Sequence, residues 1–276
     1  MRIDAHQHFW RYTPADYGWI DARMGVLARD YLPEHLQPAL AARGFDGCIA
    51  VQARCSLQEN DFLLELAARH PFVRGVVGWA DLVAPDAAAA VAALAARPRL
   101  CGLRHIVQAE ADEFLARPEF RAGVRTLRAH GLVYDVLVYA RQLPAALDFV
   151  QALDDQPFVL DHLGKPDIAG DGFLAWERSF RRFAALPHVA CKLSGLVTEA
   201  RWHAWRADDL RRYLDVALAT FGADRLLFGS DWPVCLCACR DHAAVHDVVA
   251  DWAARLGANA QQQLFGGNAA RIYRLS

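Results

Sequence analysis

The sequence has almost no excess of charge of either sign. Its 276 residues include 30 Lys and Arg against 32 Asp and Glu, so the formal net charge at pH 7 is −2. This balance gives no electrostatic reason for the chain to bind nucleic acid or an anionic membrane surface. Apolar runs long enough to cross a bilayer, which need roughly 18 residues, are also missing. We therefore expect a protein with no nucleic-acid or membrane partner.

Segments that separate domains or direct export are missing as well. No stretch rich in Gly, Ser or Pro is long enough to divide the chain, and the first residues do not combine a charged region with an apolar one. The hydrophobic fraction of 54% suits a folded core, and a chain of this length can bury roughly 75% of its unfolded surface. These features predict one domain over residues 1–276, located in the cytoplasm. No pattern in the sequence indicates an oligomeric state.

The seven cysteines do not suggest a disulfide framework. Their number is odd, and most lie in apolar runs such as the one around Cys48, which is typical of reduced core cysteine. The exception is CLCAC, where Cys235, Cys237 and Cys239 occupy alternate positions. Structural zinc sites usually have two residues between paired cysteines. We interpret this group as prone to adventitious metal capture or oxidation rather than as an evolved metal site.

Apolar, β-rich runs alternate along the chain with segments of helical periodicity. Eight runs have the nearly continuous apolar character of strands buried on both faces: RIDAH, GCIAVQ, VRGVVGW, LCGLRHIV, GLVYDVLV, PFVLDHL, VACKLSG and RLLFGSDW. Helices are predicted at residues 57–70, 85–96, 118–130, 142–153, 173–186, 208–221 and 240–256. This alternation predicts an α/β fold, a single (β/α)8 TIM-type barrel. The alternative, a doubly wound sheet, usually has a Gly-rich turn after its first strand, and DAHQHFW has none.

Polar side chains follow most of the predicted strands, where the active site of such a barrel lies. His6 and His8 are two residues apart behind the first strand, so they project to the same side of the sheet. Arg104 ends the fourth strand, His162 the sixth and Asp231 the eighth. Polar groups are costly to bury unless they are paired. We therefore expect these five side chains to share one site.

Five segments at the strand ends resemble those of a known family: DAHQHFW, GLRHIVQ, LDHLGKP, KLSGL and FGSDWP. Together they resemble the amidohydrolase superfamily, and within it the amidohydrolase-related branch that contains sugar-lactone hydrolases, other lactonases and decarboxylases. The resemblance extends from the first strand to GGNAARIY near the C-terminus. It implies a (β/α)8 barrel whose reaction centre contains the first-strand histidines and the last-strand aspartate. In this chain these are His6, His8 and Asp231, with His162 as a further member.

The resemblance also implies a metal site. Relatives that use metal generally have a histidine at the end of the fifth strand, where this chain has Tyr134, and no carboxylated lysine is evident at the fourth strand. A two-metal site is therefore not expected. One divalent ion such as Zn²⁺ on His6, His8 and Asp231, with water in an open position, suits this donor set. Because the branch includes members that work without metal, bound metal does not by itself imply a catalytic requirement.

Asp231 is the predicted general base. In a partly desolvated site its pKa can rise from about 3.9 toward a useful value, although a metal or an imidazolium would oppose that rise. The alternative role for Asp231 is structural, as the cap of a loop or as one partner of an ion pair.

His162 would orient water, polarise the carbonyl or bind metal. Arg104 would either donate two parallel hydrogen bonds to the substrate or form a structural ion pair. His105 should point away from Arg104 and is placed outside the site.

Substrate contacts are predicted from aromatic and basic residues near the strand ends. Trp10, Trp79 and Trp232 offer flat apolar faces to a sugar ring and N–H groups to its hydroxyls. As large amphipathic residues they would equally well pack the barrel. Tyr134 is a candidate hydrogen-bond donor, and Lys192 is a further basic candidate.

Three functions are compatible with these residues. The first is hydrolysis of a sugar-acid lactone, such as an L-fucono-, L-galactono- or L-rhamnono-lactone. There Asp231 would take a proton from the attacking water, and His162, Arg104 or a metal would stabilise the oxyanion. The second is metal-dependent, non-oxidative decarboxylation of a carboxylated ring, against which the absent fifth-strand histidine counts. The third is sugar binding without catalysis, which leaves Asp231 beside three histidines unexplained. The resemblance favours the first.

Overall fold

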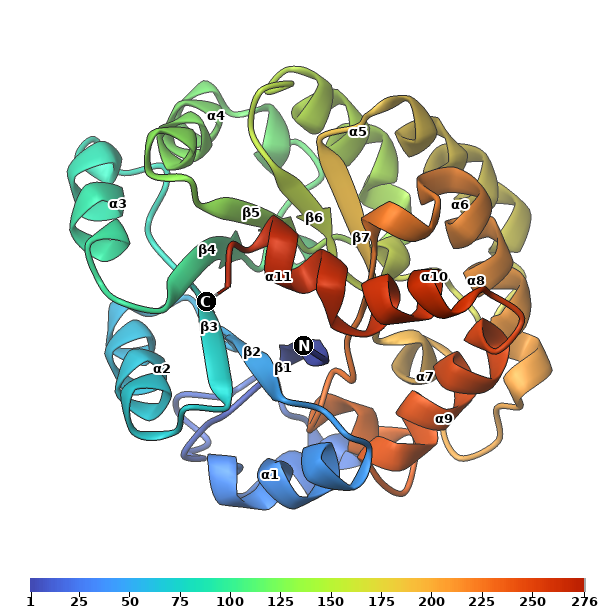
Figure 1. Ribbon diagram of the computed structural model, residues 1–276. Helices are drawn as coiled ribbons and strands as arrows, with labels where there is room; N and C mark the ends of the chain where they lie inside the picture. Colours follow the sequence, from blue (N-terminus) through green and yellow to red (C-terminus); the bar gives the residue numbers. More distant parts are fainter. Residues whose placement is uncertain (276) are drawn as a thin grey trace.

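The computed structural model describes residues 1–275, and a ring of eight parallel strands lies at its centre (Figure 1). The strands are β1 (Ile3–Gln7), β2 (Gly47–Val51), β3 (Val73–Gly78), β4 (Leu100–His105), β5 (Val133–Val136), β6 (Phe158–Leu160), β7 (Val189–Leu193) and β8 (Leu226–Phe228). Each strand pairs with the next one in chain order. All eight predicted strands are present, and the chain forms the predicted (β/α)8 barrel. The doubly wound alternative is wrong.

Helices cover the outer face of this ring (Figure 1). The α-helices are α1 (Pro33–Ala42), α2 (Leu57–Arg69), α3 (Ala87–Ala95), α4 (Pro118–Arg125), α5 (Leu143–Gln151), α6 (Phe173–Phe180), α7 (Leu196–Glu199), α8 (Ala207–Phe221), α9 (His242–Ala253), α10 (Ala258–Gln262) and α11 (Asn268–Ile272). The shorter helical turns are η1 (Ala22–Leu27), η2 (Val107–Ala109), η3 (Phe114–Ala116), η4 (Thr126–His130), η5 (Ala140–Gln142), η6 (Asp161–Gly164), η7 (Arg181–Ala185), η8 (Ala223–Arg225), η9 (Val234–Cys237) and η10 (Gln263–Gly267). Within residues 1–275, no helix combines the length and apolar character needed to cross a membrane.

The seven predicted helices are all present, with ends that differ by a few residues. Two of them, α4 and α6, change at their C-terminal ends into the tighter turns η4 and η7. The sequence pattern did not indicate α1, which has Pro38 inside it. Proline removes a backbone donor and usually marks the end of a helix, so α1 depends on the packing of Leu36 and Leu40 against the core.

The barrel closes where the segment after β8 meets β1. The amide of Asp231 donates to the carbonyl of His6 over 2.8 Å, and the amide of His8 donates to the carbonyl of Trp232 over 2.7 Å. Gln7 and Trp232 form a parallel bridge between the two segments. These bonds hold Asp231 directly beside the two histidines of the first strand.

Asp4 reinforces this seam from within the protein. Its fully buried carboxylate accepts hydrogen bonds from the amide of Ser230 over 2.9 Å and the amide of His6 over 3.2 Å. The second carboxylate oxygen lies 3.2 Å from Nε2 of His242 in α9. One side chain therefore ties together β1, the segment after β8 and a helix of the outer layer.

The C-terminal helix α11 covers one end of the barrel. In Figure 1 it runs across the middle of the view, in front of the strands. Tyr273, directly after α11, reaches into the barrel interior and donates its hydroxyl to Asp135 of β5 over 2.7 Å. The remaining interior is filled by apolar side chains such as Ile49, Val77 and Val159. This packing leaves the opposite end, at the carboxyl ends of the strands, for a functional site.

Replacing Asp4 with alanine is predicted to lower the free energy of unfolding by roughly 2–4 kcal/mol, because two buried amides lose their acceptor. Chemical denaturation followed by circular dichroism measures the change. The control is Asp171→Ala, at an exposed loop position, which should change stability by less than about 0.5 kcal/mol. Equal stability of Asp4→Ala and the wild type would contradict the role of Asp4 at the seam.

Candidate active site

A cavity of about 330 Å³ opens at the carboxyl ends of the strands, within the range of roughly 300–1,000 Å³ typical of small-molecule sites. Its lining consists of His8, Trp19, Ala53, Cys55, Arg104, Ile106, Gln108, Ala109, Glu110, Leu137, His162, Lys165, Asp231 and Val234. Four of the five residues predicted to share a site therefore line one cavity. The fifth, His6, lies against Asp231 without reaching the lining.

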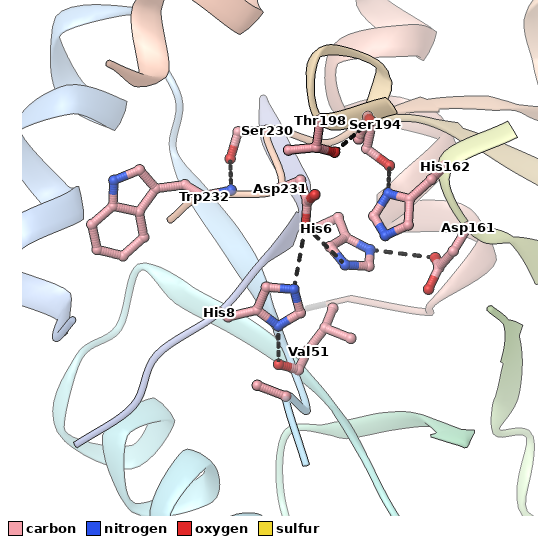
Figure 2. Close-up of polar contacts among 12 residues, drawn as sticks. His6, His8, Val51, Asp161, His162, Ser194, Thr198, Ser230, Asp231 and Trp232 are labelled. Carbon is pink, nitrogen blue, oxygen red and sulfur yellow. Dashed lines mark hydrogen bonds and ion pairs between the residues drawn. The ribbon is translucent and has the colours of Figure 1, made fainter. Parts of the chain in front are cut away.

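His6 and His8 both direct a ring nitrogen at Asp231 (Figure 2). Nε2 of His8 lies 3.4 Å from the Asp231 carboxylate, and Nε2 of His6 lies 3.8 Å from the same oxygen. Nδ1 of His8 is 2.7 Å from the carbonyl of Val51 and must donate to it, while Nδ1 of His6 lies 3.3 Å from Asp161. A proton on Nδ1 of His8 leaves the lone pair of its Nε2 available to a metal ion.

This arrangement fits a metal ion. The ligand atoms of His6, His8 and Asp231 all lie within 4.8 Å of one another, which suits a three-residue site with an open position. A second group with the same spacing consists of His6, Asp161 and His162. Within residues 1–275, the three cysteines of CLCAC belong to neither group.

The pKa of Asp231 departs from its ordinary value in the direction opposite to the prediction. Burial acts to raise this pKa, but electrostatic interaction with His162, His6 and His8 outweighs burial and holds it below the ordinary value. Burial lowers the pKa of His162 to about 4 and the pKa of His6 well below its usual range. At neutral pH the site therefore combines an ionised Asp231 carboxylate with neutral imidazoles at His6 and His162, and these are the forms that bind metal. The predicted rise is wrong because imidazoles surround the carboxylate.

His162 enters the cavity from a left-handed turn. Four successive residues, from His162 to Lys165, have φ angles between 47° and 66°, a region that costs a non-glycine residue roughly 1–2 kcal/mol. Nδ1 of His162 lies 2.8 Å from Oγ of Ser194. Gly195 provides the space for the ring, since a Cβ there would lie 2.6 Å from that nitrogen. The turn thus presents both His162 and Lys165 to the cavity.

Arg104 lines the cavity, but other residues of the protein occupy its hydrogen-bond donors. Nε and one terminal nitrogen donate to the side chain of Gln52, and the same terminal nitrogen also donates to the Gln52 carbonyl. The other terminal nitrogen donates to Asp161 over 2.9 Å and lies 3.3 Å from Nε2 of His6. The structure therefore contains the structural ion pair that the sequence left open, in place of a free bidentate donor.

Lys192 is fully buried and does not reach the cavity. Its ammonium lies 2.5 Å from Asp135, 3.0 Å from Asp161 and 3.2 Å from Nδ1 of His6. Burial acts to lower the pKa of Lys192, but the two carboxylates raise it overall, so the side chain stays charged. The contact with substrate predicted for Lys192 is replaced by contacts with two carboxylates.

Trp10 and Trp232 pack the barrel and do not line the cavity. Trp10 is fully buried and donates its indole N–H to the carbonyl of Arg29 over 2.9 Å. Trp232 packs edge-to-face on Tyr31 with ring centroids 5.0 Å apart, and Figure 2 shows its ring pointing away from the histidines. Both tryptophans therefore pack the barrel, which was the alternative to the predicted contact with a sugar ring.

Tyr134 and Trp79 also lie outside the cavity lining. Tyr134 is fully buried, with its ring 5.9 Å from that of Phe120. Neighbouring residues of a strand face opposite ways, so Tyr134 points toward the helices when Asp135 points into the barrel. Trp79 donates its indole N–H to Nδ1 of His105 over 3.0 Å.

Several cavity residues were missed because they lie in the loops and short helical turns that follow the strands. They are Trp19, Cys55, Gln108, Glu110 and Lys165. The sequence could have indicated Lys165 as a site residue, since it belongs to the LDHLGKP segment on which the family resemblance rests. The others have no periodicity to reveal them, because irregular segments position side chains through tertiary contacts.

Comparison with known proteins identifies the family. A family model described as amidohydrolase matches residues 3–275. The chain belongs to the amidohydrolase family. This amidohydrolase is 51% identical over 287 residues to an L-fucono-1,5-lactonase of Burkholderia multivorans, which covers 100% of this chain and 96% of that protein. It is 38% identical over 284 residues to an L-fucono-1,5-lactonase of Burkholderia ambifaria, with the same coverage.

A solved structure resembles this amidohydrolase over its whole length. The crystal structure of an amidohydrolase from Burkholderia multivorans with bound zinc has a TM-score of 0.96 and 50% sequence identity, and the match covers 100% of both chains.

Replacing Lys192 with methionine is predicted to lower the free energy of unfolding of the amidohydrolase by roughly 3–5 kcal/mol, because two buried carboxylates lose their cation. Adding Asp135→Asn should recover part of this loss, since one of those charges disappears. Denaturant unfolding of both single variants and the double variant measures the coupling. Losses that add within about 0.5 kcal/mol would contradict a direct interaction between Lys192 and Asp135.

Proposed function

We propose that this amidohydrolase opens a sugar-acid lactone by hydrolysis, with L-fucono-1,5-lactone as the first candidate substrate. The observation that carries the proposal is that His8, His162 and Asp231 line one small cavity, with His6 against Asp231. The two lactonases of Burkholderia, similar over nearly their whole length, support the choice of substrate class.

Asp231 handles the proton of the attacking water. Its carboxylate accepts that proton as the water oxygen bonds to the lactone carbonyl carbon, and a tetrahedral intermediate forms. Collapse of the intermediate breaks the bond to the ring oxygen, which takes the proton back from Asp231. Because the pKa of Asp231 lies below its ordinary value, the carboxylate is ionised at neutral pH, which is the form that can accept the proton.

His162 stabilises the charge that develops on the carbonyl oxygen. Burial keeps this imidazole neutral at neutral pH. Oγ of Ser194 lies 2.8 Å from Nδ1; with the hydroxyl donating to that nitrogen, Nε2 carries the ring proton and is the donor. A fixed donor aimed at a developing oxyanion is typically worth a factor of about 10²–10³ in rate. Ser194 is thereby a positioning residue for His162.

His6, His8 and Asp231 would hold the divalent ion. Their protonation states and spacing fit zinc, and a similar amidohydrolase structure contains bound zinc. When bound there, such an ion lowers the pKa of coordinated water and polarises a carbonyl. Asp161 and the carbonyl of Val51 orient the two imidazoles for this purpose.

Decarboxylation is not favoured. That reaction needs cations available to a substrate carboxylate, and the two predicted candidates are Arg104 and Lys192. Arg104 is bonded to Asp161 and Gln52, and Lys192 lies buried between Asp135 and Asp161. Neither of these two cations is available to a ligand in the cavity, and Lys165, the other cation in the lining, lies 3.6 Å from the carboxylate of Glu199.

A panel of sugar lactones tests the proposed function. Purified protein is given L-fucono-, L-galactono- and L-rhamnono-lactones, and acid release is followed with a pH indicator. Asp231→Asn keeps the size of the side chain but cannot accept the proton, so kcat should fall by a factor of roughly 10²–10⁴. The control, Asp224→Asn at an exposed position, should retain the wild-type rate.

Two results would contradict this account. Folded wild-type protein that opens none of these lactones above background would exclude the proposed substrate class. An Asp231→Asn variant as fast as the wild type would exclude Asp231 as the base.

A further inference from the structure

A carboxylate in the wall of the cavity is held in place by two residues behind it. Glu110, directly after η2, lines the cavity. Its Oε1 lies 2.9 Å from Nε2 of His105, the last residue of β4. Nδ1 of His105 in turn lies 3.0 Å from the indole nitrogen of Trp79, just beyond β3. The hydrolysis described above uses none of these three residues.

The contacts determine where the protons of this chain lie. An indole N–H can only donate, so Nδ1 of His105 accepts and the ring proton sits on Nε2. That proton points at Oε1 of Glu110. The His105 ring stacks on Phe114, with centroids 4.8 Å apart and planes 9° apart, which restricts its rotation. Trp79 and His105 therefore orient Glu110 as a hydrogen-bond acceptor.

The backbone of Glu110 is held as well. Its amide donates to the carbonyl of Val107 over 2.9 Å, and its carbonyl accepts from the side chain of Gln142 over 3.4 Å. The Glu110 side chain lines the cavity and is 39% exposed, and within residues 1–275 its hydrogen bond uses Oε1, which leaves Oε2 for a ligand. A fixed acceptor of this kind suits a ligand with several O–H groups.

We propose that Glu110 recognises hydroxyl groups of the sugar ring, with Trp79 and His105 as its positioning residues. The proposal rests on the proposed function and names how the cavity selects its substrate. Carboxylate oxygens accept short, charge-assisted hydrogen bonds from O–H donors, and neighbouring hydroxyls of a sugar supply two donors. A lactone without hydroxyls would shield the Glu110 carboxylate from water without donating a hydrogen bond to it, which costs binding free energy. Glu110 therefore selects polyhydroxylated lactones.

The neighbouring thiol does not offer a competing role for His105. Cys55 also lines the cavity, and its Sγ lies 3.9 Å from Nδ1 of His105. The indole of Trp79 already occupies that nitrogen at 3.0 Å. Burial raises the pKa of Cys55, so the side chain is a protonated thiol at neutral pH. A thiolate nucleophile paired with His105 is therefore not part of this site.

Glu110→Gln is the sharpest variant, because glutamine can still accept from His105 but presents an NH₂ donor to the cavity in place of an acceptor. The value of kcat/KM for L-fucono-1,5-lactone should fall about tenfold to a hundredfold, mainly through KM. Turnover of δ-valerolactone, the same ring without hydroxyls, should not fall. Trp79→Phe keeps an aromatic ring but removes the donor to His105, so a smaller loss with the same substrate dependence is expected. Glu113→Gln, at an exposed position of the same loop, should match the wild type.

Calorimetric binding of L-fucose separates this proposal from the proposed function, because its ring carries the hydroxyls of the lactone and an anomeric hydroxyl but no ester. Wild-type protein should bind L-fucose at least tenfold more tightly than Glu110→Gln. If the wild type opens no sugar lactone, the proposed function fails, and L-fucose binding alone decides the role of Glu110. Equal L-fucose affinities, equal losses with both lactones, or no loss with either would overturn the assignment of Glu110.

Discussion

The amide of Asp231 donates to the carbonyl of His6, and this bond joins the beginning of the barrel to its end. It places a carboxylate from near the C-terminus within 4 Å of two imidazoles from the first strand. Gly229 permits the close approach, because a Cβ there would lie 2.6 Å from that of His6. Asp231 itself has a φ of 56°, a strained conformation for a residue with a side chain. The closure of the barrel and the assembly of the site are therefore the same structural event.

Beneath this seam lies a row of buried charges of alternating sign. Asp135, Lys192, Asp161 and Arg104 follow one another across the barrel, and His6 contacts the last three. Buried ion pairs contribute little net stability, because desolvation offsets their attraction. Their consequence here is orientation, since they fix the ring of His6 from below.

The fold and the centre of the site were predictable from the sequence, whereas most of the cavity wall was not. Alternating apolar runs determined eight strands, and strand-end motifs identified His6, His8, His162 and Asp231. Strand position did not determine which side chains face a ligand. Tyr134 packs on Phe120 of the helical layer, and Trp10 and Trp232 both pack on Tyr31. The donors of Arg104 are likewise occupied by partners far away in sequence, which no local pattern reveals.

Loops explain the remaining differences. Glu110 lines the cavity because of contacts with His105 and Gln142 rather than because of any periodicity. The ring of His162, presented by a left-handed turn, has room because Gly195 at another strand end lacks a side chain. The depressed pKa of Asp231 arises from imidazoles that come together only in the folded chain. Each of these features arises from contacts between residues far apart in sequence, whereas local sequence patterns are enough to predict the barrel.

The central claim is that His6, His8 and Asp231 form one site across the closure of the barrel. Anomalous diffraction at the zinc edge, from crystals soaked in zinc, tests it most directly. The account predicts a peak about 2.0–2.2 Å from Nε2 of both histidines and from a carboxylate oxygen of Asp231. A peak confined to the CLCAC cysteines, or no peak at these three residues at saturating zinc, would contradict it.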